Sequence, residues 1–382
     1  MTGDLKKILI IGAEVQPIPP VEGGAVEHLV DLILQDNETD HYADFTVISP
    51  YTKEAEQAVA SYRHTHFCFV KDQDSLKGKI TDFGDLFARR FFDHSTGKYY
   101  LKKVCDHLLH YSGYDLVIVE NRPLFGQHIR KFYKGRLYLH LHNDFINRDS
   151  RHLKDILGNY DRYIVISEYL KKRVLEVENK ETEVLYNGVD LEDAVTNRTK
   201  DGTRNIVYVG RLVREKGVLE LIRAYKRLNR QDTKLTIVGS YDKGSEDHDR
   251  FKKELEAEFD RDDIVTVGQV PNSEVFAYYR NAYVGVVPSV VNEALSLTAI
   301  EMLGSGLPVI ATDAGGLPEV VDESCGMIIK REDLENNIRN ALERMLNNEG
   351  YRNSLSANAH QKAKIFSKDR YLKQFKKMIV EL

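Results

Sequence analysis

No apolar run in this chain of 382 residues is long enough to cross a bilayer, because a membrane-spanning helix needs about 18 or more consecutive apolar residues. The N-terminal sequence, MTGDLKKILIIGAE, holds only the short apolar run from Ile8 to Ile11, with an acidic residue before it. This pattern is typical of a first buried strand and not of a signal peptide. Hydrophobic residues make up 42% of the chain and charged residues 30%, which predicts a soluble globular protein with a sizeable core.

The chain also has few cysteines and no excess of positive charge. The three cysteines, Cys68, Cys105 and Cys325, are scattered and form neither a metal-ligand spacing nor a disulfide framework. We interpret them as inert thiols of a protein in a reducing cytoplasm. The net charge of −5 argues against nucleic acid as a partner, because binding to nucleic acid depends on a basic surface.

One window of the sequence departs from this charge balance. Between Lys77 and Arg136 there are twelve Lys or Arg residues against six Asp or Glu, and the runs RRFF (89–92) and YYLKK (99–103) mix basic and aromatic residues. Such a stretch can hold a protein against the anionic inner face of a membrane. The alternative is a solvated helix face whose aromatic side chains turn into the core, and the sequence leaves both interpretations open.

Short apolar runs rich in β-branched residues alternate with helical stretches along the chain. In the first half the expected strands are Lys7–Gly12, Phe45–Ser49, Leu116–Val119, Leu137–Leu141 and Tyr163–Ile166, with a helix from about Val26 to Leu34. In the second half they are Asn205–Val209, Lys234–Val238, Ile264–Val267, Ala282–Val287, Pro308–Ala311 and Gly326–Ile329, with helices at Val218–Leu228 and Phe251–Phe259. Such runs are typical of buried parallel strands, and their alternation with helices predicts an α/β protein with a doubly wound sheet in each half.

A polar segment, Leu191 to Arg204, separates the two halves and shows no apolar periodicity, which favours a linker. We therefore expect two Rossmann-like domains, residues 1–188 and 189–366, that face each other across a cleft. We expect residues 367–382 to form a helix that packs back on the first domain. Its apolar positions recur at helical spacing: Leu372, Phe375, Met378 and Ile379.

Two loops follow expected strands and precede expected helices, which is where open α/β sheets bind ligands. In VEGGAVE (21–27), Gly23 and Gly24 allow close approach of the backbone, and the helix start offers N–H donors; a tight structural turn is the alternative. In GRLVREKG (210–217), Arg211 and Lys216 suit a diphosphate clamp. Such a clamp stabilises a departing nucleoside diphosphate, whereas a solvated basic loop is the alternative.

Two glutamates mark the stretch PSVVNEALSLTAIEMLGSGLPVIATDAGGLPEVV (288–321). Glu293 and Glu301 are separated by seven residues, which on one straight helix places them about 12 Å apart. That exceeds the roughly 5–9.5 Å between the paired carboxylates of glycosidases, so we expect them to grip opposite ends of one extended ligand. The N–H groups of Ser296, Leu297 and Thr298 would face its phosphates. A nucleotide-sugar is such a ligand.

These motifs resemble the donor-binding signature of the family-4 retaining glycosyltransferases, which have the GT-B fold. The shared features are the two glutamates, GLPV (306–309), GGLPEVV (315–321), GRLVREKG and, at the step into the second domain, YNGVD (186–190). The resemblance covers nearly the whole chain. It implies an acceptor-side first domain, a donor-binding second domain, and transfer without a metal and with retained anomeric configuration.

The resemblance also implies a role for each matching residue in the second domain. Arg211 and Lys216 bind the diphosphate and assist the leaving group. Glu293 forms hydrogen bonds with hydroxyls of the donor sugar, and Glu301 holds the ribose hydroxyls.

In the first domain, the resemblance implies that Gly23 and Gly24 close over the phosphates and the donor sugar. The family also places a histidine at the end of a strand of this domain, and LYLHLHND offers His140 and His142. Residues i and i+2 share one face of a strand, so spacing alone leaves both open. His142 matches the family's H-D or H-N step and is our choice, with His140 as a core histidine.

The chain departs from the family's pattern after the first glutamate. The family often has E-G-F-G-L there, whereas this chain has Glu293-Ala294-Leu295-Ser296-Leu297. Alanine and serine in place of the glycines narrow the loop.

Two further motifs carry weaker signals. Asp72-Gln73-Asp74 resembles the D-x-D metal motif of the GT-A transferases, but its surroundings, KDQDSLKGK, favour a solvated loop, so we expect no metal site. Glu120, Asn121 and Arg122 follow a strand and are candidates for contact with the acceptor. Capping of the next helix is the alternative for these three residues.

The sequence therefore predicts a cytoplasmic hexosyl- or N-acetylhexosaminyltransferase that needs no metal and uses a nucleotide-sugar, most often a UDP-sugar in this family. The expected acceptor is a glycan or lipid-linked saccharide of cell-surface polysaccharide or glycoconjugate biosynthesis. The alternatives are a GT-B phosphorylase or a nucleotide-sugar epimerase and, outside enzymes, an inactive homologue that stabilises a partner. An inactive homologue would be expected to lose one of Arg211, Lys216, Glu293 or Glu301, and all four are present.

Overall fold

The computed structural model describes residues 5–71, 97–145, 152–191, 202–241 and 246–380. The D-x-D motif at 72–74, the RRFF run and most of the expected linker lie outside these residues. The chain divides into two compact units. Unit 1 comprises Met1–Tyr186 and Tyr371–Leu382, and unit 2 comprises Asn187–Arg370.

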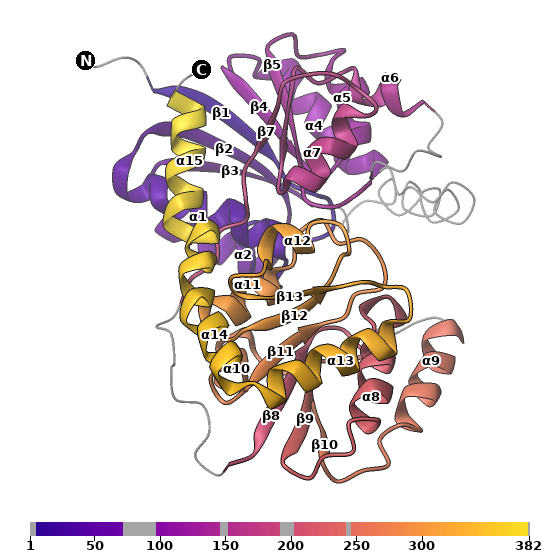
Figure 1. Cartoon of the computed structure of the whole chain (residues 1–382). Coiled ribbons are helices and arrows are strands. Elements are labelled where there is room, and N and C mark those ends of the chain that lie inside the picture. Colours follow the sequence, from indigo (N-terminus) through magenta and orange to yellow (C-terminus); the bar gives the residue numbers. More distant parts are fainter. Residues whose placement is uncertain (1–4, 72–96, 146–151, 192–201, 242–245, 381–382) are drawn as a thin grey trace. The chain divides into compact units, whose positions relative to one another are not determined.

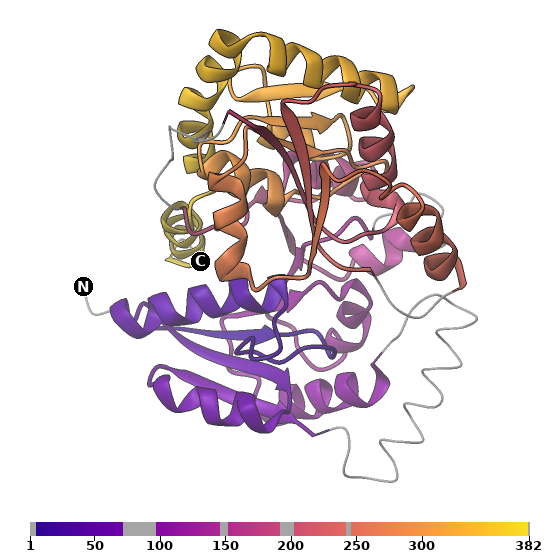
Figure 2. The same ribbon diagram turned by 90° about the horizontal axis from the view of Figure 1, so that it is seen from below.

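Unit 1 is built on a seven-stranded parallel sheet, whose strands have the order β3-β2-β1-β4-β5-β6-β7. The strands are β1 (Lys6–Ile11), β2 (Ala43–Pro50), β3 (Thr65–Val70), β4 (Leu116–Glu120), β5 (Arg136–Leu141), β6 (Arg162–Val165) and β7 (Thr182–Val184). The helices are α1 (Ala25–Asp40), α2 (Lys53–Ala58), α4 (Lys98–His110), α5 (Gly126–Ile129), α6 (Leu153–Leu157) and α7 (Glu168–Leu175), with short 3₁₀ turns η1 (Val59–Ser61) and η2 (Pro123–Phe125). Helices cover both faces of this sheet (Figure 2), which explains why its central strands are apolar throughout.

Unit 2 repeats this plan with a six-stranded parallel sheet in the order β10-β9-β8-β11-β12-β13. Its strands are β8 (Arg204–Val209), β9 (Thr233–Val238), β10 (Ile264–Gly268), β11 (Val284–Val287), β12 (Val309–Thr312) and β13 (Gly326–Ile329). The helices are α8 (Val218–Lys226), α9 (Glu246–Glu256), α10 (Asn272–Arg280), α11 (Leu297–Gly304), α12 (Leu317–Val320), α13 (Leu334–Asn347) and α14 (Glu349–Ala363), with 3₁₀ turns η3 (Arg214–Lys216) and η4 (Lys364–Phe366). Figure 1 labels these strands and α-helices along the chain.

The two doubly wound sheets confirm the fold expected from the sequence. Every expected strand is present, and its observed ends differ from the expected ends by no more than two residues. Strands β3 and β7 at the sheet edges were not expected, because THFCFV is mixed in character and TEV is only three residues long. The first helix continues to Asp40, six residues beyond its expected end.

The strand order places one switch point in each sheet. In unit 1 the order reverses between β1 and β4, and in unit 2 between β8 and β11. Parallel strands end at the same edge of a sheet, and at a switch point the loops that follow two neighbouring strands diverge and leave a crevice for a ligand. The loops after β1 and β4 in unit 1, and after β8 and β11 in unit 2, hold the sequence motifs described above.

Helix α15 (Lys368–Val380) returns the chain to unit 1. Its buried side chains, Tyr371, Leu372, Phe375, Met378 and Ile379, join the core formed by α1 and the first strands, beside which the helix is drawn in yellow in Figure 1. Polar contacts fix its register, since the hydroxyl of Tyr371 donates to the carbonyl of Leu29 at 3.2 Å. The amide of Gln374 donates to the carbonyl of Val184 at 2.6 Å.

Among the described residues, no helix has both the length and the hydropathy needed to cross a membrane. The described part of the basic and aromatic window includes α4, in which Tyr100, Leu101 and Val104 are buried and Lys102 and Lys103 are exposed. The hydroxyl of Tyr100 donates to the carbonyl of Ile48 at 2.8 Å. These contacts favour the interpretation as a solvated helix face for α4, while attachment to a membrane stays a prediction.

We predict that Phe375→Ala destabilises unit 1. The Phe375 side chain is 1% exposed and its ring lies 6.5 Å from that of Phe45, centroid to centroid. Loss of a buried phenylalanine costs about 3–5 kcal/mol, measurable as a lower urea midpoint by circular dichroism. The exposed Lys373 on the same helix gives a matched control, Lys373→Ala, which should shift stability by no more than about 0.5 kcal/mol. Equal effects of the two substitutions would contradict the assignment of α15 to the core of unit 1.

Candidate functional site

The loop after β8 is held by backbone bonds to the neighbouring strand. Gly210 N–H donates to the carbonyl of Val238 at 3.0 Å, and Leu212 N–H to that of Ser240 at 2.8 Å. The hydroxyl of the buried Tyr208 donates to the carbonyl of Arg211 at 2.8 Å. The backbone of this loop is therefore fixed while the side chain of Arg211 is exposed at the surface.

Lys216 and Glu293 form an ion pair between the loops that follow β8 and β11. The ammonium Nζ of Lys216 lies 2.9 Å from Oε1 of Glu293, and the two side chains are 30% and 10% exposed. The hydroxyl of Ser289 also donates to Oε1 of Glu293. A backbone bond from Val290 N–H to the carbonyl of Glu215, at 2.8 Å, joins the same two loops. The structure thus brings together two predicted site residues that are 77 positions apart in the sequence.

The glycine turn at 315–316 supports the backbone of Glu293. Gly316 N–H donates to the carbonyl of Glu293 at 2.7 Å, and Gly315 has a φ of +61°. A Cβ at position 315 would overlap the backbone of Glu293. Only glycine fits this conformation and this contact, which explains the GG of the sequence motif.

Helix α11 begins directly after this loop. Ser296 is its N-cap, and the hydroxyl of Ser296 accepts from the N–H of Ala299 at 3.4 Å. The N–H groups of a helix's first turn have no partner within the helix, and they make the helix start favourable for an anion. The start of α11, with Leu297 and Thr298, directly follows the loop that contains Glu293 of the Lys216–Glu293 pair.

Glu301 lies in the second turn of α11 and contacts a tyrosine of α10. The hydroxyl of Tyr279 donates to Oε2 of Glu301 at 2.9 Å. Burial raises the pKa of Glu301, and the bond from Tyr279 opposes that rise. Burial raises the pKa of Tyr279 as well, so its hydroxyl keeps its proton and remains the donor.

In unit 1, the loop after β1 ends in two glycines with positive φ, +89° at Gly23 and +99° at Gly24. A Cβ at position 24 would overlap the side chains of Gln16 and Glu27. Glu27 is buried in the first turn of α1, and this burial raises the pKa of its carboxyl group. The backbone at Gly24 therefore approaches polar side chains too closely for any other residue.

The loop after β4 connects three strand ends. Asn121 has a φ of +56°, its N–H donates to the carbonyl of His140 at 2.8 Å, and its Oδ1 accepts from the N–H of His142 at 3.1 Å. The guanidinium Nε of Arg122 donates to Glu14, after β1, at 2.5 Å. Asn121 and Arg122 thus fix these loops to one another.

Glu120 and the two histidines form a buried cluster at the ends of β4 and β5. Glu120, His140 and His142 are 2%, 1% and 6% exposed. Oε2 of Glu120 lies 3.0 Å from Nδ1 of His140 and 2.9 Å from Nε2 of His142. Burial alone would raise the pKa of Glu120, but the two histidines outweigh burial and lower this pKa to about 2. Burial, followed by the neighbouring His140, lowers the pKa of His142 to about 4.

This cluster is also the one group among the described residues whose His, Cys, Asp and Glu donor atoms converge as metal ligands do, within 4.8 Å. Histidine ligands of a metal normally donate their second ring N–H to a partner. Here Nε2 of His140 and Nδ1 of His142 are buried without a hydrogen-bond partner. The cluster therefore lacks the surroundings of a metal site and is better described as a carboxylate that accepts from two histidines.

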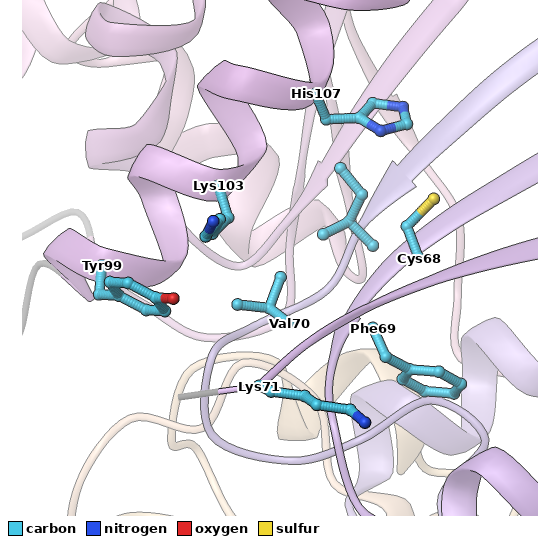
Figure 3. A pocket seen from close by; sticks show the side chains of 8 residues that line it. Cys68, Phe69, Val70, Lys71, Tyr99, Lys103 and His107 are labelled. Carbon is cyan, nitrogen blue, oxygen red and sulfur yellow. The ribbon is translucent and has the colours of Figure 1, made fainter. Parts of the chain in front are cut away.

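A pocket of about 320 Å³ lies elsewhere in unit 1, between β3 and α4. Lys71, Tyr99, Lys103 and His107 are among the residues that line it (Figure 3). The two lysines and the aromatic rings suit a sugar ring or an anionic group. None of the predicted site residues is among the described residues that line it, and the sequence did not suggest this pocket.

Sequence reasoning also missed several residues that contact the predicted site residues. Tyr279 and Ser289 contact the two glutamates of unit 2, and Glu14 contacts Arg122 in unit 1. Ser289 had a usable signal, because it lies four residues before Glu293 in the same loop. Tyr279 had none, because it is one apolar position of an ordinary helix.

Two family profiles match this chain and together span most of it. The profile described as "Glycosyl transferases group 1" matches residues 191–362, and the one described as "Glycosyltransferase Family 4" matches residues 23–193. YtcC of Bacillus subtilis, a glycosyltransferase by its assigned name, is 27% identical over 93% of this chain and 87% of its own length. The lipopolysaccharide 1,2-N-acetylglucosaminetransferase of Salmonella typhimurium is 29% identical over 54% of this chain and 56% of its own.

Solved structures share the fold of the whole chain. Sucrose-phosphate synthase of Thermosynechococcus elongatus superposes with a TM-score of 0.76 at 20% identity, covering 98% of each chain. Alr3699/HepE of Anabaena in complex with UDP gives a TM-score of 0.72 at 17% identity, covering 98% of this chain and 100% of that one. These likenesses show that the fold is GT-B.

We predict that unit 1 loses stability in mild acid because of His142. The pKa of this histidine falls from 6.5 to about 4 on folding, so the unfolded chain binds the proton more tightly. The stability contribution is therefore present above pH 6.5 and is lost as the pH falls toward 4, by about 2 kcal/mol between pH 7 and pH 5. Urea unfolding at both pH values measures this loss. His142→Gln should flatten the dependence by that amount, and an unchanged slope would refute the assignment.

Proposed function

We propose that this chain, which belongs to family 4 of the glycosyltransferases (glycosyl transferases group 1), transfers a sugar from a UDP-sugar to a saccharide acceptor with retention of anomeric configuration. The proposal rests above all on the Lys216–Glu293 pair, which sets a cation and a carboxylate side by side at the switch point of unit 2. The cation suits a diphosphate and the carboxylate suits sugar hydroxyls. Both are parts of one nucleotide-sugar.

The diphosphate is bound by the loop after β8 and the start of α11. Arg211 donates to phosphate oxygens with its forked guanidinium, and Lys216 acts as a compact positive charge. The first-turn N–H groups at Ser296, Leu297 and Thr298 add donors and the positive end of the helix dipole. As the bond to the sugar breaks, negative charge gathers on the leaving phosphate, and the two cations stabilise that charge most in the transition state.

Glu293 and Glu301 hold the two ends of the donor. Glu293 accepts hydrogen bonds from hydroxyls of the transferred sugar, after Lys216 turns toward the diphosphate. Glu301 accepts from the ribose hydroxyls, and Tyr279 fixes the orientation of its carboxylate. The choice of UDP as the nucleotide is supported by HepE, the structural relative whose structure contains UDP.

In unit 1, Gly23 and Gly24 let the backbone approach the substrate, and His142 contacts a sugar hydroxyl. Asn121 and Arg122 keep their predicted place on the acceptor side. The acceptor is a glycan or lipid-linked saccharide of polysaccharide or glycoconjugate biosynthesis. That class is supported by the lipopolysaccharide N-acetylglucosaminetransferase among the relatives, and the transfer needs no metal.

We predict that Lys216→Ala lowers kcat for donor turnover about 10²- to 10³-fold, because it removes a preorganised cation from the leaving group. UDP release from UDP-sugars, with and without saccharide acceptors, measures this change, and circular dichroism checks folding. Arg214→Ala is the matched control in the same turn, since Arg214 pairs with Glu254 of α9 at 2.5 Å, and it should stay within about threefold. Turnover by a folded Lys216→Ala variant at the rate of the control would reject the proposed role.

The same assay separates the proposal from its alternatives. A phosphorylase would release a sugar phosphate when phosphate is the only acceptor, and an epimerase would change the donor sugar without releasing UDP. An inactive homologue would not turn over any donor. Transfer to a saccharide, detected by mass spectrometry, is the result that we expect.

We also predict that Tyr279→Phe weakens UDP binding about tenfold, because a hydrogen bond to a charged group contributes about 1.5 kcal/mol. The hydroxyl lowers the pKa of Glu301 against the effect of burial, so its loss raises that pKa further. Affinity should then begin to fall at a higher pH on acidification, because a protonated Glu301 accepts fewer hydrogen bonds. Isothermal titration calorimetry with UDP across pH measures both effects. Tyr278→Phe, one position along α10, is the control, and identical curves for the two variants would exclude this role of Tyr279.

A further inference from the structure

The placement of Glu120 follows from the sheet of unit 1. Strands β4 and β5 are parallel neighbours, and Glu120 is in register with His140. His142 lies two residues after His140, so the two rings are on one face at the strand end, with centroids 4.0 Å apart. All three side chains are more than nine-tenths buried. Both carboxylate oxygens of Glu120 lie within 3.3 Å of a histidine ring nitrogen, so Glu120 contacts the two histidines directly.

The hydrogen bonds of this cluster determine which ring nitrogens carry protons. An ionised carboxylate only accepts, and Oε2 of Glu120 is within 3.0 Å of both Nδ1 of His140 and Nε2 of His142. Each of these two nitrogens must therefore donate an N–H. In a neutral imidazole the other nitrogen is then an acceptor, and for His142 that atom is Nδ1, which is buried without a partner.

We propose that Glu120 is a positioning residue that holds His142 in the Nε2–H tautomer, so that Nδ1 offers a lone pair to a hydroxyl of the sugar substrate. The part that concerns the sugar rests on the proposed function. The part that concerns the tautomer rests only on the contacts within unit 1. A buried acceptor that lacks a hydrogen bond costs free energy, and a sugar hydroxyl supplies the missing donor.

His140 is the second partner of the carboxylate and makes the arrangement testable. A glutamine at position 120 has one acceptor oxygen and one donor NH₂ group. With that oxygen in the place of Oε2, it can accept from both histidines, as Oε2 does in the natural protein, whereas a leucine at position 120 accepts from neither. Glu120→Leu therefore lets His142 adopt either tautomer, and Glu120→Gln keeps it as Nε2–H.

The first measurement is long-range ¹H–¹⁵N NMR of protein labelled at histidine, with the His142 signal assigned through its loss in His142→Gln. We expect Nε2–H with an unprotonated Nδ1 in the natural protein and a mixture of tautomers in Glu120→Leu. A His142 protonated at Nδ1 alone in the natural protein would overturn the proposal, whatever its activity. Stoichiometric zinc in the purified protein, whose removal changes the His142 signals, would overturn it in favour of a metal site.

The second measurement is turnover. We expect Glu120→Leu to lower kcat about 10²-fold or more, as a wrong histidine tautomer does in other enzymes, with UDP affinity unchanged within about twofold because the proposed nucleotide residues lie in unit 2. His140→Phe alone keeps the bond between Glu120 and His142 and should keep kcat within about threefold.

The conservative variant Glu120→Gln decides between a positioning role and a purely structural one. Its amide oxygen accepts from Nε2–H of His142, so it should keep the natural tautomer and at least tenfold of the kcat that Glu120→Leu loses. A folded Glu120→Gln variant that is as slow as Glu120→Leu would overturn the proposal. If the natural protein shows the expected tautomer but transfers no sugar, the proposed function fails and the tautomer assignment stands.

Discussion

The parallel direction of the strands is the constraint on which the rest of this structure depends. In both sheets every strand ends at the same edge, and the order reverses once, between β1 and β4 in unit 1 and between β8 and β11 in unit 2. Polar residues that follow these four strands are therefore brought together although they are far apart in the sequence. Lys216 and Glu293 meet for this reason, as do Glu14 and Arg122.

Burial then forces these polar groups to find partners. An unpaired charge or an unsatisfied donor in a dry environment costs free energy, and the structure meets that demand with pairs: Lys216 with Glu293, and Tyr279 with Glu301. A ligand that offers phosphates and hydroxyls can take over these bonds without leaving a group unsatisfied. Under the proposed function, side chains that are paired in the free protein are in this way already placed for a sugar nucleotide, and little further ordering is needed on binding.

The sequence predicted the sheets well and also marked Lys216 and Glu293, which the fold brings together, because both signals are local. The roles of these residues in binding stay predictions. Buried parallel strands are apolar runs, and the motifs around Arg211 and Glu293 are continuous stretches with fixed glycines. The glycine at 315 can be understood from one contact with the Glu293 backbone. Strands β3 and β7 were missed because edge strands are short and mixed in composition. Partners such as Tyr279 were missed because a helix position says nothing about which side chain of another helix it meets.

The cluster around Glu120 marks the limit of what such patterns contain. From the sequence, Glu120 and the two histidines were separate candidates, and spacing could not choose between His140 and His142. The register of β4 with β5 brings them together. Because the three side chains are buried, the hydrogen bonds that they share determine which ring nitrogens carry protons. Since a carboxylate can only accept, the bonds of Glu120 to the two rings fix both tautomers at once. His142 differs from His140 in being held by Nε2 instead of Nδ1, and this difference, not the spacing, gives the two histidines distinct chemistry.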